Sequence, residues 1–266
     1  MSGHVPQRVR RSALSSQLGV LHALLVREMQ QRFGRSRIGY VWLLAEPLLL
    51  GFGIAVLHWM TESHLPNNIP VFLFYALGYM PFYMFRSILT RNAGAIPQSM
   101  QLLFHRNIKL HDRTMSRTML EVVACMAVVA LLVGGGIVFL GEWPAYPGLF
   151  VLSLLLSALL GHGFGTLLAS LITFYEPLER VIHPLTDLMM PFSGAFVMLS
   201  SVTPSAREAL LWVPLVHVHE AMRYAQWGDR IVAYYNIPYT LLWVLVLNVL
   251  AIASLRVARR HLTMSG

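Results

Sequence analysis

An acidic residue and a proline interrupt the first long apolar run of this chain. Residues 27–50 read REMQQRFGRSRIGYVWLLAEPLLL, so that a basic stretch leads directly into apolar sequence containing Glu46 and Pro47. A carboxylate at bilayer depth is costly unless it faces protein or water, and a proline leaves a backbone carbonyl that neighbouring helices must satisfy. The pair therefore predicts a helix face that turns toward protein or an aqueous path rather than toward lipid.

The composition is that of an integral membrane protein. Hydrophobic residues make up 56% of the 266 residues and charged residues only 12%, whereas soluble domains carry roughly 25% charged residues. A helix needs about 20 mostly apolar residues to cross a bilayer. Six segments meet this requirement, although Asp187 and Pro191 lower the apolar content of the fifth. The expected spans are residues 39–60, 70–90, 119–140, 149–174, 184–203 and 239–255.

The placement of the basic residues predicts the orientation of the chain. If each span crosses once, 17 of the 20 Lys and Arg residues fall on one side, and only Arg207, Arg223 and Arg230 fall on the other. The positive-inside rule then places both termini in the cytoplasm. The net charge of +8 is thus a topology signal rather than a sign of nucleic-acid binding, and contact with anionic membrane lipid is its second role.

Residues 1–38 are expected to form a cytoplasmic tail followed by an amphipathic helix. Apolar residues recur at positions 14, 18, 21, 25 and 29, which is the spacing of one helix face. A helix of this kind with arginines at its end is typical of the membrane interface, although a soluble helix packed on a partner protein has the same pattern. Residues 39–266 then form one transmembrane domain.

Two short segments do not fit simple membrane hairpins. Residues 96–104 read IPQSMQLLF and predict a short loop helix with a proline in its first turn. Its apolar edge must pack against either a partner protein or the membrane interface. Residues 209–218 form an apolar run that is broken by Pro214 and is too short to cross the bilayer. Such runs are typical of re-entrant or interfacial segments, so a re-entrant segment is expected over residues 204–226.

The sequence lacks the motifs of several function classes. Its one lysine, Lys109, is not part of a Walker A motif, so the chain is not itself the ATPase of a transporter. The GHGFG run at 161–165 lies inside an apolar span, and close helix packing explains it better than nucleotide binding. His217 and His219 diverge on a helix without an obvious third ligand, which favours a polar lining over a metal site. No motif of a hydrolase or a glycosyltransferase is present, and the chain is not expected to be an enzyme.

The junction at residues 27–50 closely resembles the start of ABC-2-type polysaccharide export permeases, where a basic-Glu…Arg-Phe/Tyr…Gly-Tyr/Phe-x-Trp…Glu-Pro pattern opens the first membrane helix. The likeness extends over nearly all 266 residues in the order and length of the segments. It implies an all-α fold of six transmembrane helices, with an N-terminal interfacial helix and a re-entrant outer hairpin before the last span. It also implies a homodimer with two copies of a separate ATPase subunit, which bind ATP and Mg²⁺ while this chain binds no cofactor directly.

Among these permeases, those of capsule exporters fit the junction best. The resemblance therefore implies export of a long, acidic, lipid-linked capsular polysaccharide across the inner membrane of a Gram-negative bacterium. Periplasmic and outer-membrane export proteins would complete the route. Permeases for O-antigen, teichoic acid, small lipids or drugs share the architecture and are alternatives, and a structural membrane protein without transport activity is a more remote one.

The resemblance and the residue chemistry together indicate contact sites on the cytoplasmic side. Residues of the N-terminal helix and of the loop helix are expected to couple the chain to the ATPase: Arg27, Glu28, Ile96, Pro97, Met100, Leu103 and Phe104. The planar guanidinium group binds phosphate or carboxylate in a bidentate way. Arginines at the cytoplasmic ends of the first two spans are expected to receive an acidic substrate: Arg32, Arg35, Arg37, Arg86 and Arg91.

Two further groups are expected to serve the translocation path and its outer gate. Sugar rings stack on aromatic faces, and Tyr and Trp add hydrogen-bonding groups. The predicted path residues are Tyr40, Trp42, Glu46, Phe52, Trp59, Tyr83, Phe192 and Phe196. The predicted outer-gate residues are Trp212, His217, His219 and Arg223. Helix packing and interfacial anchoring explain most of the aromatic residues, and only part of the set is expected to face the path.

Overall fold

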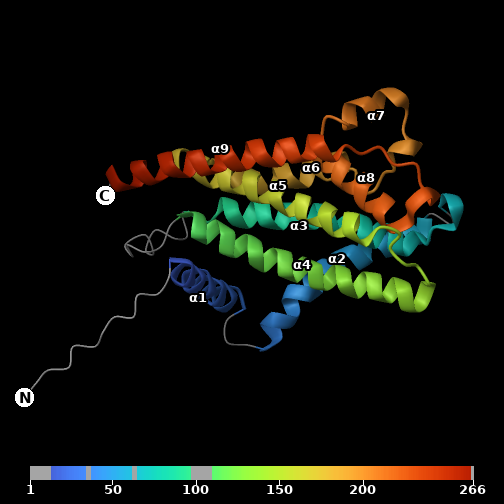
Figure 1. The fold of residues 1–266 in the computed structure, drawn as a ribbon, viewed down its shortest axis with the longest axis horizontal. Coiled ribbons are helices and arrows are strands. Elements are labelled where there is room, and N and C mark those ends of the chain that lie inside the picture. Colours follow the sequence, from blue (N-terminus) through green and yellow to red (C-terminus); the bar gives the residue numbers. More distant parts are fainter. Residues whose placement is uncertain (1–12, 34–36, 62–64, 97–109, 265–266) are drawn as a thin grey trace, which may run out of the picture.

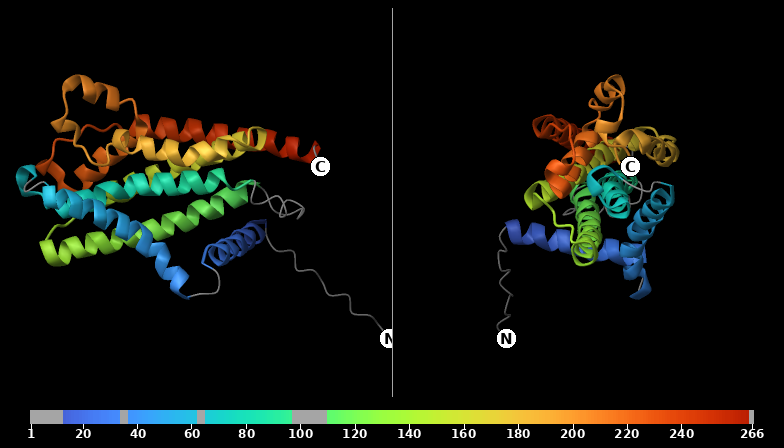
Figure 2. Two further views of the ribbon diagram at one scale, coloured as in Figure 1. Left: turned by 180° about the vertical axis from the view of Figure 1, so that it is seen from behind. Right: turned by 90° about the vertical axis from the view of Figure 1, so that its right-hand side faces the viewer.

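The structure is a computed structural model that describes residues 13–33, 37–61, 65–96 and 110–264. The described residues are helical apart from turns and connections, and they contain no strand. The long helices form an elongated bundle (Figure 1). α1 and the C-terminal end of α9 lie at one end of the bundle, called here the α1 end, and α7 lies toward the opposite end, called the α7 end (Figures 1 and 2).

Nine α-helices are assigned within the described ranges. They are α1 (Ala13–Phe33), α2 (Arg37–Thr61), α3 (Val71–Ala93), α4 (Leu110–Leu140), α5 (Pro147–Phe174), α6 (Leu178–Met189), α7 (Pro204–Leu210), α8 (Pro214–Trp227) and α9 (Ile237–Met264). Short 3₁₀ turns connect several of them: η1 (Pro66–Asn68), η3 (Pro191–Ser193), η4 (Leu199–Ser201) and η5 (Gly228–Arg230).

Four of the described helices are long and apolar enough to cross a membrane. These are α3, α4, α5 and the Ile237–His261 part of α9, and Ala45–Thr61 of α2 forms a shorter apolar helix. The all-helical fold is therefore confirmed. The five helices overlap the first, second, third, fourth and sixth predicted spans, although α4 begins at Leu110, well before residue 119.

The predicted fifth span, residues 184–203, is not one continuous helix. α6 ends at Met189. It is followed by η3, then by Gly194 in the left-handed conformation with φ of +83°, and then by η4. Pro191 has no backbone N–H to continue the hydrogen bonding of α6, and glycine adopts positive φ without steric cost. The helix is therefore broken within the predicted span that has the lowest apolar content. Residues 204–226, which are expected to be re-entrant, form the short helix α7 and most of α8, and α8 begins at Pro214.

α5 lies at the centre of the bundle and packs most extensively on α3 and α9. A Cβ atom at Gly161 would lie 2.7 Å from the carbonyl oxygen of Phe85, and one at Gly165 would lie 2.6 Å from that of Leu89. Gly163 approaches α9 in the same way. Only a residue without a side chain allows helix axes to come this close. The expected packing role of this glycine run is confirmed.

Candidate functional site

A cavity of about 340 Å³ lies toward the α1 end and is lined mainly by charged and polar side chains. We call it the charged cavity. The last turns of α3 supply one helix face to it: Tyr83, Arg86, Ser87, Thr90 and Arg91. Residues of α1, α2, α4 and α6 complete the lining: Glu28, Glu46, Arg117 and His183. Five helices therefore meet around one polar space.

Glu28 attaches α1 to α4 at this cavity. Its Oε1 lies 3.1 Å from Arg117 Nε, and its Oε2 lies 3.5 Å from Arg113 Nη2. Arg113 also donates a hydrogen bond to Gln31 Oε1 at 3.3 Å. Both arginine side chains are buried, and removing one partner of a buried ion pair costs roughly 3–5 kcal/mol. α1 is therefore held against α4 by charge.

Arg91 joins α3 to α4 beside the same space. Its Nε lies 2.7 Å from Oε1 of Glu121, a carboxylate that is only 2% exposed. Arg117 Nη1 donates a hydrogen bond to the backbone carbonyl of Arg91 at 2.5 Å. Arg91 therefore balances a buried carboxylate, which gives it a structural role whatever else it contacts.

Arg86 has a more exposed partner than the other arginines of the charged cavity. Its Nη2 lies 2.5 Å from Asp187 Oδ1 on α6, but the Asp187 side chain is 57% exposed. The Arg86 Nε is buried and donates no hydrogen bond within the described part of the chain. Because exposed ion pairs contribute only about 0–1 kcal/mol, Asp187 holds Arg86 less firmly than Glu28 and Glu121 hold the other two arginines of this cavity.

A second polar cluster, on α8, holds the broken segment that follows α6. Arg223 is only 1% exposed and donates hydrogen bonds to the backbone carbonyls of Gly194 and Ala195 at 2.7 Å and of Val197 at 2.9 Å. Glu220 balances the charge, with Oε1 3.2 Å from Arg223 Nη1. Backbone carbonyls freed by a helix break must find partners inside the protein when they lie at bilayer depth. One arginine supplies those partners here.

Glu220 also binds the backbone of two connecting segments, one before α7 and one before α9. Its Oε1 accepts a hydrogen bond from the backbone N–H of Leu199 at 3.3 Å, and its Oε2 accepts one from that of Tyr234 at 3.0 Å. Leu199 belongs to η4, and Tyr234 lies just before α9. The Glu220–Arg223 pair therefore fixes α8 to the chain on both sides of it.

The two histidines of α8 also hold backbone groups. His217 Nδ1 accepts a hydrogen bond from the Asn236 N–H at 3.1 Å, and its Nε2 lies 2.9 Å from the carbonyl oxygen of Leu211. The neutral tautomer with the proton on Nε2 satisfies both contacts. His219 Nδ1 lies 2.8 Å from the carbonyl oxygen of Leu215. These contacts are intramolecular and structural, and no group of three or more His, Cys, Asp or Glu side chains in the described residues could hold a metal ion.

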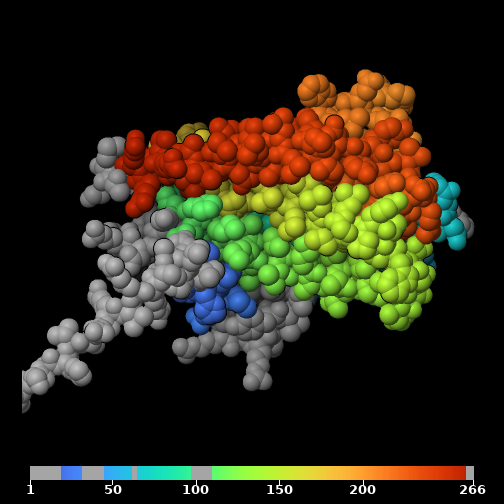
Figure 3. Space-filling model, in the orientation of Figure 1, coloured from blue at the N-terminus to red at the C-terminus, as the bar shows by residue number. Residues whose placement is uncertain are grey.

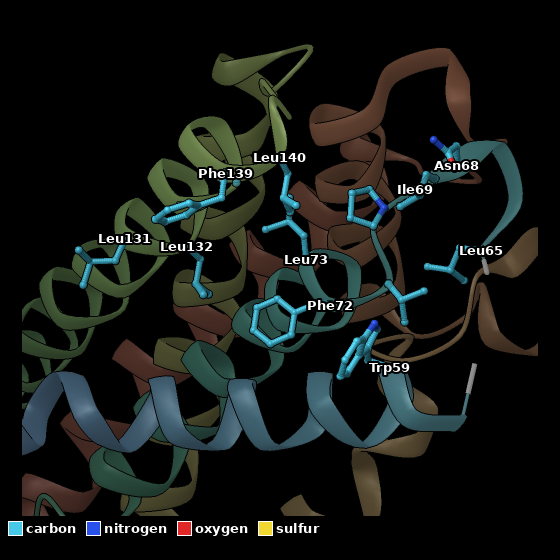
Figure 4. A pocket seen from close by; sticks show the side chains of 14 residues that line it. Trp59, Leu65, Asn68, Ile69, Phe72, Leu73, Leu131, Leu132, Phe139 and Leu140 are labelled. Atoms are coloured by element: carbon cyan, nitrogen blue, oxygen red, sulfur yellow. The ribbon is translucent and has the colours of Figure 1, made fainter. Parts of the chain in front are cut away.

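A separate apolar cavity of about 620 Å³ lies near the opposite end, where α2, α3 and α4 meet. Figure 4 shows side chains from these three helices around it, among them Trp59, Phe72 and Leu132. Gly136 of α4 allows close contact with Leu73, because a Cβ there would lie 2.9 Å from Leu73 Cδ2. The lining of this space is mainly apolar, in contrast to that of the charged cavity.

Comparison with known proteins decides the family. The chain matches the ABC-2 type transporter family over residues 20–227. It belongs to this family. The chain of this ABC-2 transporter is 32% identical over 245 residues to the capsule polysaccharide export inner-membrane protein CtrC of Neisseria meningitidis serogroup B, covering 91% of each chain.

Two further relatives of the ABC-2 chain have similar coverage. It is 28% identical over 249 residues to the capsule polysaccharide export inner-membrane protein BexB of Haemophilus influenzae, covering 92% of this chain and 93% of the relative. It is 32% identical over 253 residues to the polysialic acid transport protein KpsM of Escherichia coli, covering 92% and 96%.

The structure of this ABC-2 protein brings some of the predicted site residues together. Glu28, Glu46, Tyr83, Arg86 and Arg91 all line the charged cavity, although the sequence assigned them to three different roles. Arg27 is half-buried on α1. The backbone of Arg32 lies in α1, and that of Arg37, Tyr40 and Trp42 lies in α2.

The other predicted residues lie apart from this cavity. Phe196 stacks on Tyr79 of α3, with ring centroids 6.3 Å apart, and Ile96 is buried beside Leu110 and Leu255. Four predicted residues have largely exposed side chains: Phe52, Trp59, Phe192 and Trp212. Another five lie outside the described residues: Arg35, Pro97, Met100, Leu103 and Phe104.

The sequence did not reveal which carboxylates pair with the arginines of the charged cavity. Asp187 stood out as an acidic residue within an apolar span, but nothing in the sequence paired it with Arg86, or Glu121 with Arg91. For Glu220 a signal existed, because it precedes Arg223 by three residues on a helix and such residues are neighbours on one face.

Proposed function

We propose that this chain is the transmembrane subunit of an ATP-driven exporter that carries capsular polysaccharide across the bacterial inner membrane. The observation that supports this most strongly is the similarity, over about nine-tenths of the chain, to proteins named for capsule polysaccharide export and polysialic acid transport. Such similarity over the full membrane domain favours a shared cargo class as well as a shared fold.

ATP is hydrolysed by a separate subunit in this proposal. The sequence has no Walker A motif around its single lysine, so two ATPase copies carrying ATP and Mg²⁺ would act on a homodimer of this chain. Contacts are proposed at α1 and at the loop helix, through Arg27, Glu28, Ile96, Pro97, Met100, Leu103 and Phe104. The anchoring of Glu28 to Arg113 and Arg117 supports this, because a displacement of α1 would move α4 with it.

The chain crosses the membrane six times in the proposed arrangement. α2, α3, α4, α5 and α9 form five crossings, and the interrupted segment from α6 through η4 forms the remaining one. α1 lies at the cytoplasmic interface, and α7 with α8 forms a re-entrant hairpin at the outer side. The 17-to-3 distribution of basic residues and the burial of α8 beside α5 and α9 support this orientation.

The charged cavity is proposed to receive the acidic substrate on the cytoplasmic side. Arg86 supplies the planar guanidinium group that binds a phosphate or carboxylate. Positive charge nearby comes from four further arginines: Arg32, Arg35, Arg37 and Arg91. Glu46 has a structural role beside Pro47 in this proposal, because a negative charge would repel an acidic polymer.

The path beyond the cavity is proposed to run along the interface of the homodimer. The exposed side chains of Phe52, Trp59 and Phe192 are available to a second copy or to sugar rings, and the remaining proposed lining residues are Tyr40, Trp42, Tyr83 and Phe196. At the outer side Trp212 is exposed. His217, His219 and Arg223 act on the gate indirectly, since they hold the backbone that forms it.

Deletion of the gene in its own host tests the proposal. Loss of surface capsule together with accumulation of the same polysaccharide inside the cell is the expected result, and the wild-type gene restores the surface polymer. Normal capsule with loss of another surface glycan would assign the cargo to that glycan. Normal levels of every surface glycan would reject polysaccharide export and favour a small lipid or a drug as cargo.

A further inference from the structure

A third cavity, of about 310 Å³, lies between the start of α4 and the last turns of α9. Its lining residues are Leu110, His111, Ile252, Leu255, Arg256 and Arg259. Leu110 and Leu255 belong to a small buried apolar cluster, so apolar side chains and two arginines line the same cavity. The charged cavity, in contrast, is lined mainly by charged and polar side chains.

The two arginines of this cavity are available to a ligand. Arg256 and Arg259 are exposed, and neither forms an ion pair or a side-chain hydrogen bond with another described residue. Their spacing of three residues places them on one face of α9, where like charges repel each other. An anion between them would relieve this repulsion.

An exposed apolar stripe on α9 leads to these arginines. Leu242, Leu245, Val249 and Ile252 precede Arg256 at steps of three and four residues, and their exposed fractions are 57%, 62%, 56% and 44%. Figure 3 shows α9 uncovered along the edge of the bundle. The stripe from Leu242 to Ile252 is about 15 Å long at 1.5 Å per residue, which is half of the roughly 30 Å hydrocarbon core. It therefore matches the depth of one leaflet.

We propose that the α4–α9 cavity binds the headgroup of one anionic phospholipid, whose acyl chain lies along this stripe. Arg256 and Arg259 hold the phosphate, and Ile252 and Leu255 contact the glycerol and the first methylenes. Free phosphate would leave the apolar wall unused, and an acidic protein segment would not need a stripe that continues to mid-bilayer depth. The bound lipid connects α4 to α9 and is distinct from the exported cargo.

Lipid binding to the purified full-length chain tests this inference. Native mass spectrometry counts the lipids retained after addition of phosphatidylglycerol or of phosphatidylcholine with the same acyl chains. A preference of about tenfold or more for phosphatidylglycerol is expected, since each arginine near an anionic lipid contributes favourably. The double variant R256Q/R259Q should reduce this preference to about twofold or less, whereas R256K/R259K should keep most of it because charge is preserved.

Matched controls separate this site from general charge effects. Arg180→Gln removes one exposed arginine outside the cavity and should leave the preference unchanged, whereas Arg256→Gln or Arg259→Gln alone should lower it partly. Inorganic phosphate alone and phosphatidylglycerol with six-carbon chains should each protect the chain from heat less than the long-chain lipid does.

Three results would overturn the inference. They are equal retention of the two lipids by the wild-type chain, an undiminished preference in R256Q/R259Q, and equal protection by inorganic phosphate alone. If R256Q/R259Q keeps the lipid preference but no longer co-purifies with the ATPase, this surface binds protein instead of lipid.

Discussion

Replacing Arg223 by methionine is expected to destabilise the protein strongly, because the guanidinium group serves several buried partners at once. It donates hydrogen bonds to three backbone carbonyls within 2.9 Å and lies 3.2 Å from Glu220. Methionine fills a similar volume but leaves the carbonyls without donors and Glu220 without a balancing charge. Breaking a buried pair in this way costs roughly 3–5 kcal/mol.

Unfolding in detergent, followed by tryptophan fluorescence, measures this cost, because Trp227 lies on the same helix and is only 4% exposed. Arg230 provides a matched control, since its side chain also pairs with a carboxylate, Glu142, at 2.7 Å but is 37% exposed. Arg230 also donates hydrogen bonds to the backbone carbonyls of Asn67 and Asn68. Because these contacts are exposed, Arg230→Met should cost less than Arg223→Met, roughly 1–2 kcal/mol. Adding Glu220→Gln to Arg223→Met should recover part of the loss, because no uncompensated charge then remains. Equal losses in Arg223→Met and Arg230→Met would refute the assignment of a structural role to the buried pair.

Three further predictions concern packing and the charged cavity. Gly165→Ala should lower the free energy of unfolding by roughly 1–3 kcal/mol, because the added Cβ would meet the Leu89 carbonyl. Gly135→Ala adds its Cβ in open space and should be neutral or stabilise by up to about 1 kcal/mol. Equal losses in the two variants would argue against close α3–α5 packing. Arg86→Gln should reduce surface polysaccharide about tenfold through loss of a charge-assisted hydrogen bond, with an intermediate loss in Arg86→Lys, and unchanged export in both would exclude Arg86 from substrate binding. Glu46→Gln should keep export near the wild-type level with normal expression, and a loss of export in the folded variant would show that the charge of Glu46 is required.

Much of the fold was predictable from local sequence. Long apolar runs identified five of the helices, and the glycine run in α5 indicated close packing because glycine in a helix is otherwise unfavourable. The break after α6 was visible only as Pro191 and polar residues. What holds that break together was not predictable, because Arg223 lies on another helix and meets Gly194 and Ala195 only in the folded chain.

The candidate site was predictable in its chemistry but not in its grouping. Glu46 was singled out because a charged residue at bilayer depth needs protein or water around it, and Arg86 because it lies at the cytoplasmic end of the second predicted span. Their meeting in one cavity depends on how α2 packs against α3, and pairing with Asp187 depends on the position of α6. No periodicity within a single segment contains that information.

Transport into inverted membrane vesicles tests the central claim most directly. Vesicles containing this chain and its ATPase are given radiolabelled capsular polysaccharide and ATP, and a polysaccharide lyase is then added outside. The account predicts that ATP makes part of the polymer resistant to the lyase, and that vesicles without this chain protect none. ATP hydrolysis by the assembled complex without any protected polymer would contradict the claim that this chain forms the path for polysaccharide.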